Sequence, residues 1–113
     1  LTEETFHFLD DIFISDMRKN FWVINTSRGK VVDSPSLLKG LVSGKVLGAG
    51  LDVFENEQFY QLEGDDKLIM EKMCGFENII LTPHIAGWTH ESYFKISKIL
   101  AERIEVLALP NVK

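Results

Sequence analysis

Three short apolar runs, each followed by polar residues, constrain the fold of this chain more than any other feature. The runs are residues 21–25, 46–53 and 79–82, and segments with helical spacing separate them. Buried strands that alternate with helices are typical of βαβ units and of a parallel sheet. We therefore predict an α/β fold with an open, doubly wound parallel sheet.

The segments between the runs carry start and stop signals for helices. Ser34 and Pro35 read as an N-cap followed by proline at the first helical position, and Gly44 reads as the residue after the helix end. Within the second run, Gly48 and Gly50 indicate that a backbone or ligand comes close. We expect helices at residues 3–10, 15–19, 34–44, 66–73 and, capped by Thr89, from there to Pro110.

Composition narrows the classes of protein to which the chain can belong. Its 113 residues suit about one domain. A net charge of −5 with twelve scattered basic residues argues against a nucleic-acid or membrane-surface partner. The single Cys74 cannot form an internal disulfide, which favours the reducing cytoplasm. Because residue 1 is leucine and a helix start follows at once, we expect a fragment of a longer protein.

Polar side chains at the ends of the apolar runs suggest a site. Arg28 follows the first run, Asp52 and Glu57 the second, and His84 the third. Open α/β sheets bind ligands beyond the carboxyl ends of their strands. A guanidinium can hold a carboxylate bidentately, and an imidazole can transfer a proton near neutral pH. Spacing alone does not separate Glu57 from Glu55 as the carboxylate beside His84.

Structural roles compete with these interpretations. Arg28 could form a structural ion pair, and His84 could be a core or capping histidine. A metal site is conceivable from His84, His90, Asp52 and Glu57, but neither HxxxH nor HExxH spacing occurs, so we predict no metal. His7 and His90 fall on predicted helices, without a comparable setting.

Four motifs give the chain a family resemblance. In chain order, LTEET, INTSRGKVVD, GLDVFENE and LTPHIAG resemble the D-isomer-specific 2-hydroxyacid dehydrogenases. The resemblance implies the second half of a Rossmann-type NAD-binding domain, residues 1–88, and a C-terminal helix, residues 89–113, that returns toward an absent substrate domain.

The resemblance also implies roles for single residues. Arg28 corresponds to the arginine that holds the substrate carboxylate, and His84 to the general acid/base. The 29-residue step from Arg28 falls on Glu57, not Glu55, so Glu57 is implied to orient the histidine. Asp52 is implied to take the nicotinamide carboxamide. Cofactor-binding positions are implied at Thr26, Ser27, Arg28, Asp52, His84, Ile85, Ala86 and Gly87.

For the whole protein, the resemblance implies hydride transfer between NAD and a small 2-hydroxy or 2-oxo acid, with NADP also open, and a homodimer. A non-catalytic NAD-sensing relative and an inactive truncated remnant are the alternatives. The chain departs from the family pattern at Gln58, where proline is usual, in a longer loop between Glu57 and His84, and at the bulky Trp88. These departures bear on the choice of substrate.

Overall fold

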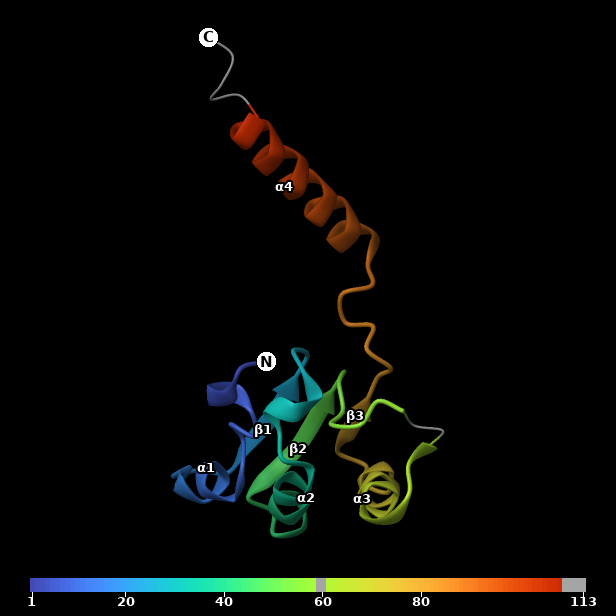
Figure 1. Ribbon diagram of the computed structural model, residues 1–113. Coiled ribbons are helices and arrows are strands. Elements are labelled where there is room, and N and C mark those ends of the chain that lie inside the picture. The colour runs from blue at the N-terminus through green and yellow to red at the C-terminus, as the bar shows by residue number, and fades with distance from the viewer. Residues whose placement is uncertain (59–60, 109–113) are drawn as a thin grey trace.

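The computed structural model describes residues 1–58 and 61–108. Its elements alternate as the apolar runs predict (Figure 1). Strands β1 (Phe21–Asn25), β2 (Val46–Leu51) and β3 (Ile79–Leu81) form one parallel sheet in the order β1-β2-β3. The helices are α1 (Asp11–Asp16), α2 (Ser34–Val42), α3 (Gly64–Cys74) and α4 (His90–Ala108), with short 3-10 turns η1 (Glu3–Thr5) and η2 (Gly29–Val31).

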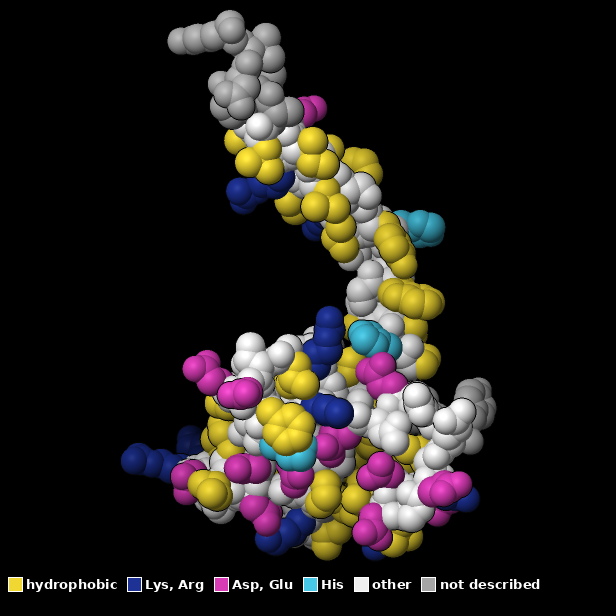
Figure 2. Space-filling model, viewed as in Figure 1, with side chains coloured by type: hydrophobic (Ala, Val, Ile, Leu, Met, Phe, Trp, Pro, Cys, Tyr) yellow, Lys and Arg dark blue, Asp and Glu magenta, His cyan; other side chains and the backbone are white. Residues whose placement is uncertain are grey.

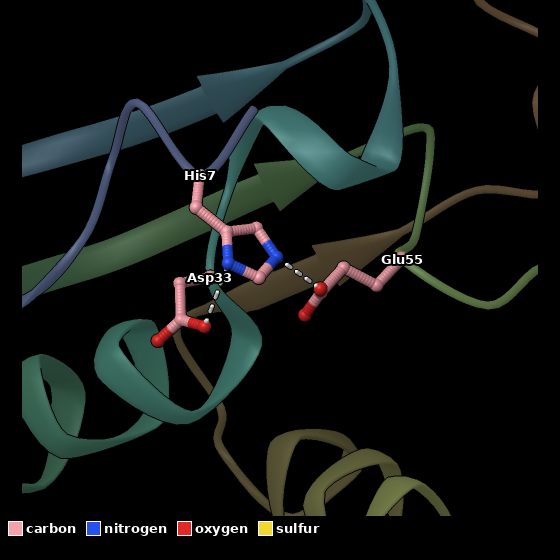
Figure 3. Close-up of side chains that lie close together, drawn as sticks. All are labelled: His7, Asp33 and Glu55. Atoms are coloured by element: carbon pink, nitrogen blue, oxygen red, sulfur yellow. Dashed lines mark hydrogen bonds and ion pairs between the residues drawn. The ribbon is translucent and has the colours of Figure 1, made fainter. Parts of the chain in front are cut away.

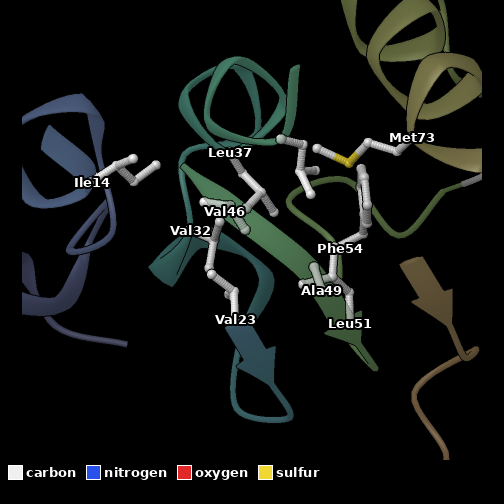
Figure 4. Packing of buried hydrophobic residues seen from close by; sticks show 10 residues of the cluster. Ile14, Val23, Val32, Leu37, Val46, Ala49, Leu51, Phe54 and Met73 are labelled. Atoms are coloured by element: carbon white, nitrogen blue, oxygen red, sulfur yellow. The ribbon is translucent and has the colours of Figure 1, made fainter. Parts of the chain in front are cut away.

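The core lies between the sheet and the helices that connect its strands. Leu37 from α2, Met73 from α3 and Val46 from β2 are its most completely buried side chains (Figure 4). Strand β1 alternates, with Val23 and Asn25 turned inward. This packing places α2 and α3 on one face and confirms the predicted α/β sheet of partial Rossmann type.

The opposite face of the sheet is uncovered within the described residues. Trp22, Ile24 and Ile80 are 63%, 79% and 70% exposed. Gly48 of β2 packs closely against its neighbours. A Cβ there would stand 2.3 Å from the Trp22 ring and 2.4 Å from the Asn78 carbonyl oxygen, so the position has no room for a side chain. The predicted close approach is therefore confirmed at Gly48, whereas a Cβ at Gly50 would meet only Ile24, at 3.9 Å.

Helix α4 projects away from the globular part on an extended segment (Figure 1). The hydroxyl of Thr89 accepts a hydrogen bond from the Ser92 N–H, which confirms the predicted cap. An apolar stripe runs along the helix and is exposed (Figure 2); its residues are Tyr93, Ile96, Ile99, Leu100, Ile104 and Leu107. The end of this prediction, residues 109–113, lies outside the described residues. No helix in residues 1–58 and 61–108 combines the length and apolarity of a membrane span.

Two helix predictions near the N-terminus are wrong. Residues 3–10 form only η1, after which His7 takes a left-handed φ of 49° and Leu9 pairs with Val32 in an isolated bridge. Long-range hydrogen bonds hold this segment in place of a helix, since the N–H of Leu9 donates to the carbonyl of Val31. The helix predicted at 15–19 is α1 instead, and its N-cap is Asp10, whose carboxylate accepts from the Phe13 N–H.

The other boundaries shift by a few residues. Asp33, not Ser34, caps α2, because its carboxylate accepts from the Ser36 N–H. Gly44, with a φ of 74°, follows the helix as predicted. Strand β2 ends at Leu51, two residues before the predicted end. The next residue, Asp52, accepts a hydrogen bond from the Thr82 hydroxyl through its carboxylate.

Gly29 lets the turn after β1 press against the loop after β2. A Cβ at Gly29 would stand 1.7 Å from the Phe54 carbonyl oxygen. We expect Gly29→Ala to lower the free energy of unfolding by about 1–3 kcal/mol, because the backbone must move apart. Urea unfolding measures this change. Gly50→Ala is the matched control, with only ordinary contact at its Cβ; equal losses in both variants would contradict the argument.

Candidate active site

The three residues predicted to be catalytic meet at the carboxyl edge of the sheet. Arg28, Glu57 and His84 line one open hollow of about 950 Å³. Basic, acidic and imidazole side chains gather on the face of the globular part that turns toward α4 (Figure 2). The three residues come from the segments after β1, β2 and β3, so the parallel order of the strands brings them together.

Arg28 stands on a turn that the buried Asn25 organises. The Asn25 side chain donates to the Arg28 carbonyl at 3.0 Å and accepts from the N–H and the hydroxyl of Ser27. The Arg28 guanidinium donates to the Ser27 carbonyl at 2.7 Å. In the described part of the chain it forms no ion pair with a carboxylate. Its remaining donors are therefore available to an anion in the hollow.

His84 and Glu57 form a pair. His84 Nδ1 lies 3.3 Å from the Glu57 carboxylate, and both side chains are about half exposed. His84 Nε2 has no partner within residues 1–58 and 61–108, so one nitrogen of this hollow-lining ring is held and the other is available. An imidazole oriented in this way by a carboxylate can give or take a proton at its second nitrogen.

Asp52 holds the turn that presents His84. One carboxylate oxygen of Asp52 accepts from the Thr82 hydroxyl at 2.6 Å and the Ile85 N–H at 2.8 Å, and the other accepts from the Ala86 N–H at 2.9 Å. The Asp52 carbonyl accepts from the His84 N–H at 2.8 Å. These bonds fix His84 at a φ of 56°, in the left-handed region that a non-glycine residue enters only when its surroundings hold it there.

The same contacts set the ionisation of Asp52. Burial raises the pKa of this carboxyl group. The three hydrogen bonds to its oxygens and the positive charge of His84 lower the pKa by more, so it lies below the ordinary value. Asp52 thus stays ionised and keeps both oxygens as acceptors for the turn.

The lowered pKa of Asp52 predicts a pH-dependent contribution to stability. A depressed folded-state pKa stabilises the fold above the unfolded value, near pH 4, and the contribution is lost as the pH falls through the folded pKa. Asp52→Asn should lower Tm by ~5 °C at pH 7, because an amide group would face backbone N–H donors. The difference from wild type should shrink below about pH 4. Thermal unfolding at several pH values measures it, with the exposed Asp16→Asn as control; a pH-independent difference would contradict it.

Sequence reasoning missed one cluster of polar side chains. His7 Nε2 lies 2.6 Å from Glu55, and His7 Nδ1 lies 3.4 Å from Asp33 (Figure 3). Within the described residues, these three are the only His, Cys, Asp or Glu group of this size whose ligand atoms lie within 4.8 Å of one another. The predicted placement of His7 on a helix is wrong, and no short-range signal marks the cluster, because 48 positions separate His7 from Glu55.

Comparison with known proteins places this arrangement in a family. Residues 1–86 match the family described as D-isomer specific 2-hydroxyacid dehydrogenase, NAD binding domain. Glyoxylate reductase of Thermococcus litoralis is 38% identical over 108 residues, and the match covers 96% of this chain and 30% of that protein. Aromatic 2-oxoacid reductase of Clostridium sporogenes is 32% identical, with 96% of this chain and 34% of that protein covered.

A solved structure agrees. The D-lactate dehydrogenase of Aquifex aeolicus, crystallised with NAD and lactic acid, superposes with a TM-score of 0.74 and 34% identity, covering 96% of this chain and 34% of that one. The chain therefore spans about a third of the length of these relatives. From its motifs, its sheet and these matches, the chain belongs to the D-isomer specific 2-hydroxyacid dehydrogenases, as part of their NAD-binding domain.

Proposed function

We propose that the complete gene product containing this chain is an NAD-dependent oxidoreductase that interconverts a 2-oxo acid and a 2-hydroxy acid. The observation that carries the proposal is the meeting of Arg28, Glu57 and His84 in one hollow at the carboxyl ends of three parallel strands. A fixed cation, a carboxylate and an oriented imidazole suit a small acid whose carbonyl must gain a proton. Family membership supports the same chemistry.

A nicotinamide ring would lie beside the hollow, at residues that, apart from Arg28 and His84, are not among those lining it. Thr26 and Ser27 are exposed after β1, and at Gly87 after β3 a Cβ would meet nothing within 4 Å, which leaves open space at the backbone. The Asp52 carboxylate has about four acceptor positions, and three of them accept hydrogen bonds from the turn. One position, on the oxygen bonded to Ala86, therefore remains for a carboxamide. Thr26, Ser27, Arg28, Asp52 and the segment 84–87 would hold the cofactor's nicotinamide end.

Each proposed catalytic residue has a separate task. Arg28 binds the substrate carboxylate and, through its charge, stabilises the oxygen that becomes negative at C2. Protonated His84 gives its proton from Nε2 to that oxygen in reduction, and neutral His84 takes it back in oxidation. Glu57, at Nδ1, holds the ring in the required orientation. A nicotinamide held by these residues would supply the hydride in reduction and accept it in oxidation.

The test is NADH and NADPH oxidation by the complete gene product with glyoxylate, hydroxypyruvate, pyruvate, phosphohydroxypyruvate and an aromatic 2-oxo acid. Turnover of any of them supports the proposal and identifies the substrate class. Absence of turnover with NADH still bound would overturn it and favour an NAD-sensing relative. Absence of both turnover and binding would favour an inactive remnant.

Other parts of the assignment stay predictions. We propose that residues 1–88 belong to the nucleotide-binding domain and residues 89–113 to the helix that leads toward the substrate domain. A homodimer and a cytoplasmic location follow from the family resemblance and the single cysteine. Light scattering of the complete product tests the dimer.

A further inference from the structure

His7 contacts two of the three segments that carry proposed catalytic side chains, although it does not line the hollow itself. Its backbone N–H donates to the carbonyl of Lys30 at 2.8 Å, two residues after Arg28. Its side chain Nε2 lies 2.6 Å from Glu55, two residues before Glu57. One residue of the N-terminal segment thus connects the turn after β1 to the loop after β2.

The backbone of His7 is held in an unusual conformation. Its φ of 49° is in the left-handed region, where a non-glycine residue is strained unless its surroundings fix it. In the described part of the chain, only His84 among the other non-glycine residues has a positive φ. The next hydrogen bond, from the Leu9 N–H to Val31, holds the segment against η2. The strain at His7 is therefore kept by contacts with η2.

The side chain of His7 lies between two carboxylates that are anchored elsewhere (Figure 3). The second oxygen of Glu55 accepts from the Ser34 N–H at 2.8 Å, and the second oxygen of Asp33 accepts from the Ser36 N–H at 3.0 Å. Both carboxylates thus also cap the N-terminus of α2. The three side chains of the cluster are only 23–30% exposed, which makes their attraction stronger than that of a fully solvated pair.

We call the cluster of His7, Asp33 and Glu55 the clamp. Each ring nitrogen of His7 faces a carboxylate, and each carboxylate is bonded to the backbone of α2, so the cluster's polar atoms are engaged with one another and with the helix. The clamp holds Glu55, and through it the loop leading to Glu57, against the turn that bears Arg28. Gly29 and the Phe54 carbonyl oxygen meet at the same junction.

We propose that His7 is a positioning residue that sets the placement of Glu57 relative to Arg28 and His84, an inference that rests on the proposed function for its effect on turnover. Without the Glu55 contact, the loop moves and Glu57 no longer orients the His84 ring. A misplacement of about 1 Å at a reacting group costs roughly 10²-fold in rate.

Two substitutions separate the two sides of the His7 ring. His7→Asn keeps a short amide that reaches toward Asp33, tolerates a positive φ, and is too short to reach Glu55. His7→Gln has the longer amide that reaches Glu55. His90→Asn is the matched control, because His90 is exposed at the start of α4. All three variants are made in the complete gene product.

The expected result is a split between the two variants. In His7→Asn, kcat should fall roughly 10- to 100-fold with an unchanged KM for NADH, while His7→Gln should stay within about threefold of wild type. In a Glu57→Gln background, His7→Asn should cause little further loss, because the two changes act through one group. Equal kcat in the Asn and Gln variants, or losses that simply multiply with Glu57→Gln, would overturn the proposal.

A second readout does not depend on turnover. NMR amide shifts of Arg28 and Glu57 should change in His7→Asn and stay near wild type in His7→Gln and His90→Asn. Unchanged shifts in His7→Asn would overturn the positioning role whatever the activity. If the shifts change but wild type reduces no 2-oxo acid, the proposed function fails and the clamp stands.

Discussion

Replacing His84 with alanine should lower kcat for reduction of a 2-oxo acid by about 10²- to 10⁴-fold, the contribution typical of a positioned general acid. Nε2 of His84 is the nitrogen that Glu57 leaves available, so alanine removes the proton donor. The ring contributes little to packing because it is about half exposed, and the fold should be preserved. Steady-state kinetics with the best substrate of the panel measures the loss.

The His84 experiment has a matched control and a specific signature. His90→Ala removes an exposed histidine from the start of α4 and should leave kcat unchanged. NADH affinity of His84→Ala, measured by fluorescence, should fall far less than kcat, because the proton donor acts in the transition state and the backbone of the segment 84–87 is kept. Parallel losses of NADH binding and kcat would contradict the acid/base role. The kcat of Glu57→Gln should lie between those of wild type and His84→Ala.

Replacing Arg28 with glutamine should lower kcat/KM for the 2-oxo acid by roughly 10²- to 10³-fold, because a charged donor to the substrate is lost. The Arg28 side chain is exposed, and in the part of the chain that the structure describes its guanidinium donates only to the neighbouring Ser27 carbonyl, so Tm should change little. Arg28→Lys should recover only part of the loss, since an ammonium is a point charge without the planar fork.

Substrate-dependent kinetics checks the role of Arg28. The KM for the 2-oxo acid should rise in both Arg28 variants while the Kd for NADH changes far less. Arg18→Gln, at an exposed position after α1, is the control and should behave as wild type. An Arg28 variant with normal kcat/KM for a 2-oxo acid would remove the carboxylate-binding role.

The positions of the site residues were largely predictable because the signal is local. A buried strand of a parallel sheet must end before a turn, and parallel order brings such ends to one edge. Arg28, Glu57 and His84 therefore came together as expected. The cofactor role of Asp52 stays a prediction; what sequence reasoning did not foresee is that its carboxylate also holds the turn of Thr82, Ile85 and Ala86.

The sequence by itself determined the order and type of the main elements, since apolar runs and helical spacing act over a few residues. It also determined which polar groups stand at the strand ends. The tertiary structure alone decided that residues 6–9 form a turn and an isolated bridge rather than a helix, and that His7 joins Glu55 and Asp33. Those outcomes depend on hydrogen bonds between residues far apart in the chain, from the N–H groups of His7 and Leu9 to the carbonyls of Lys30 and Val31, which outweigh the local preference for a helix.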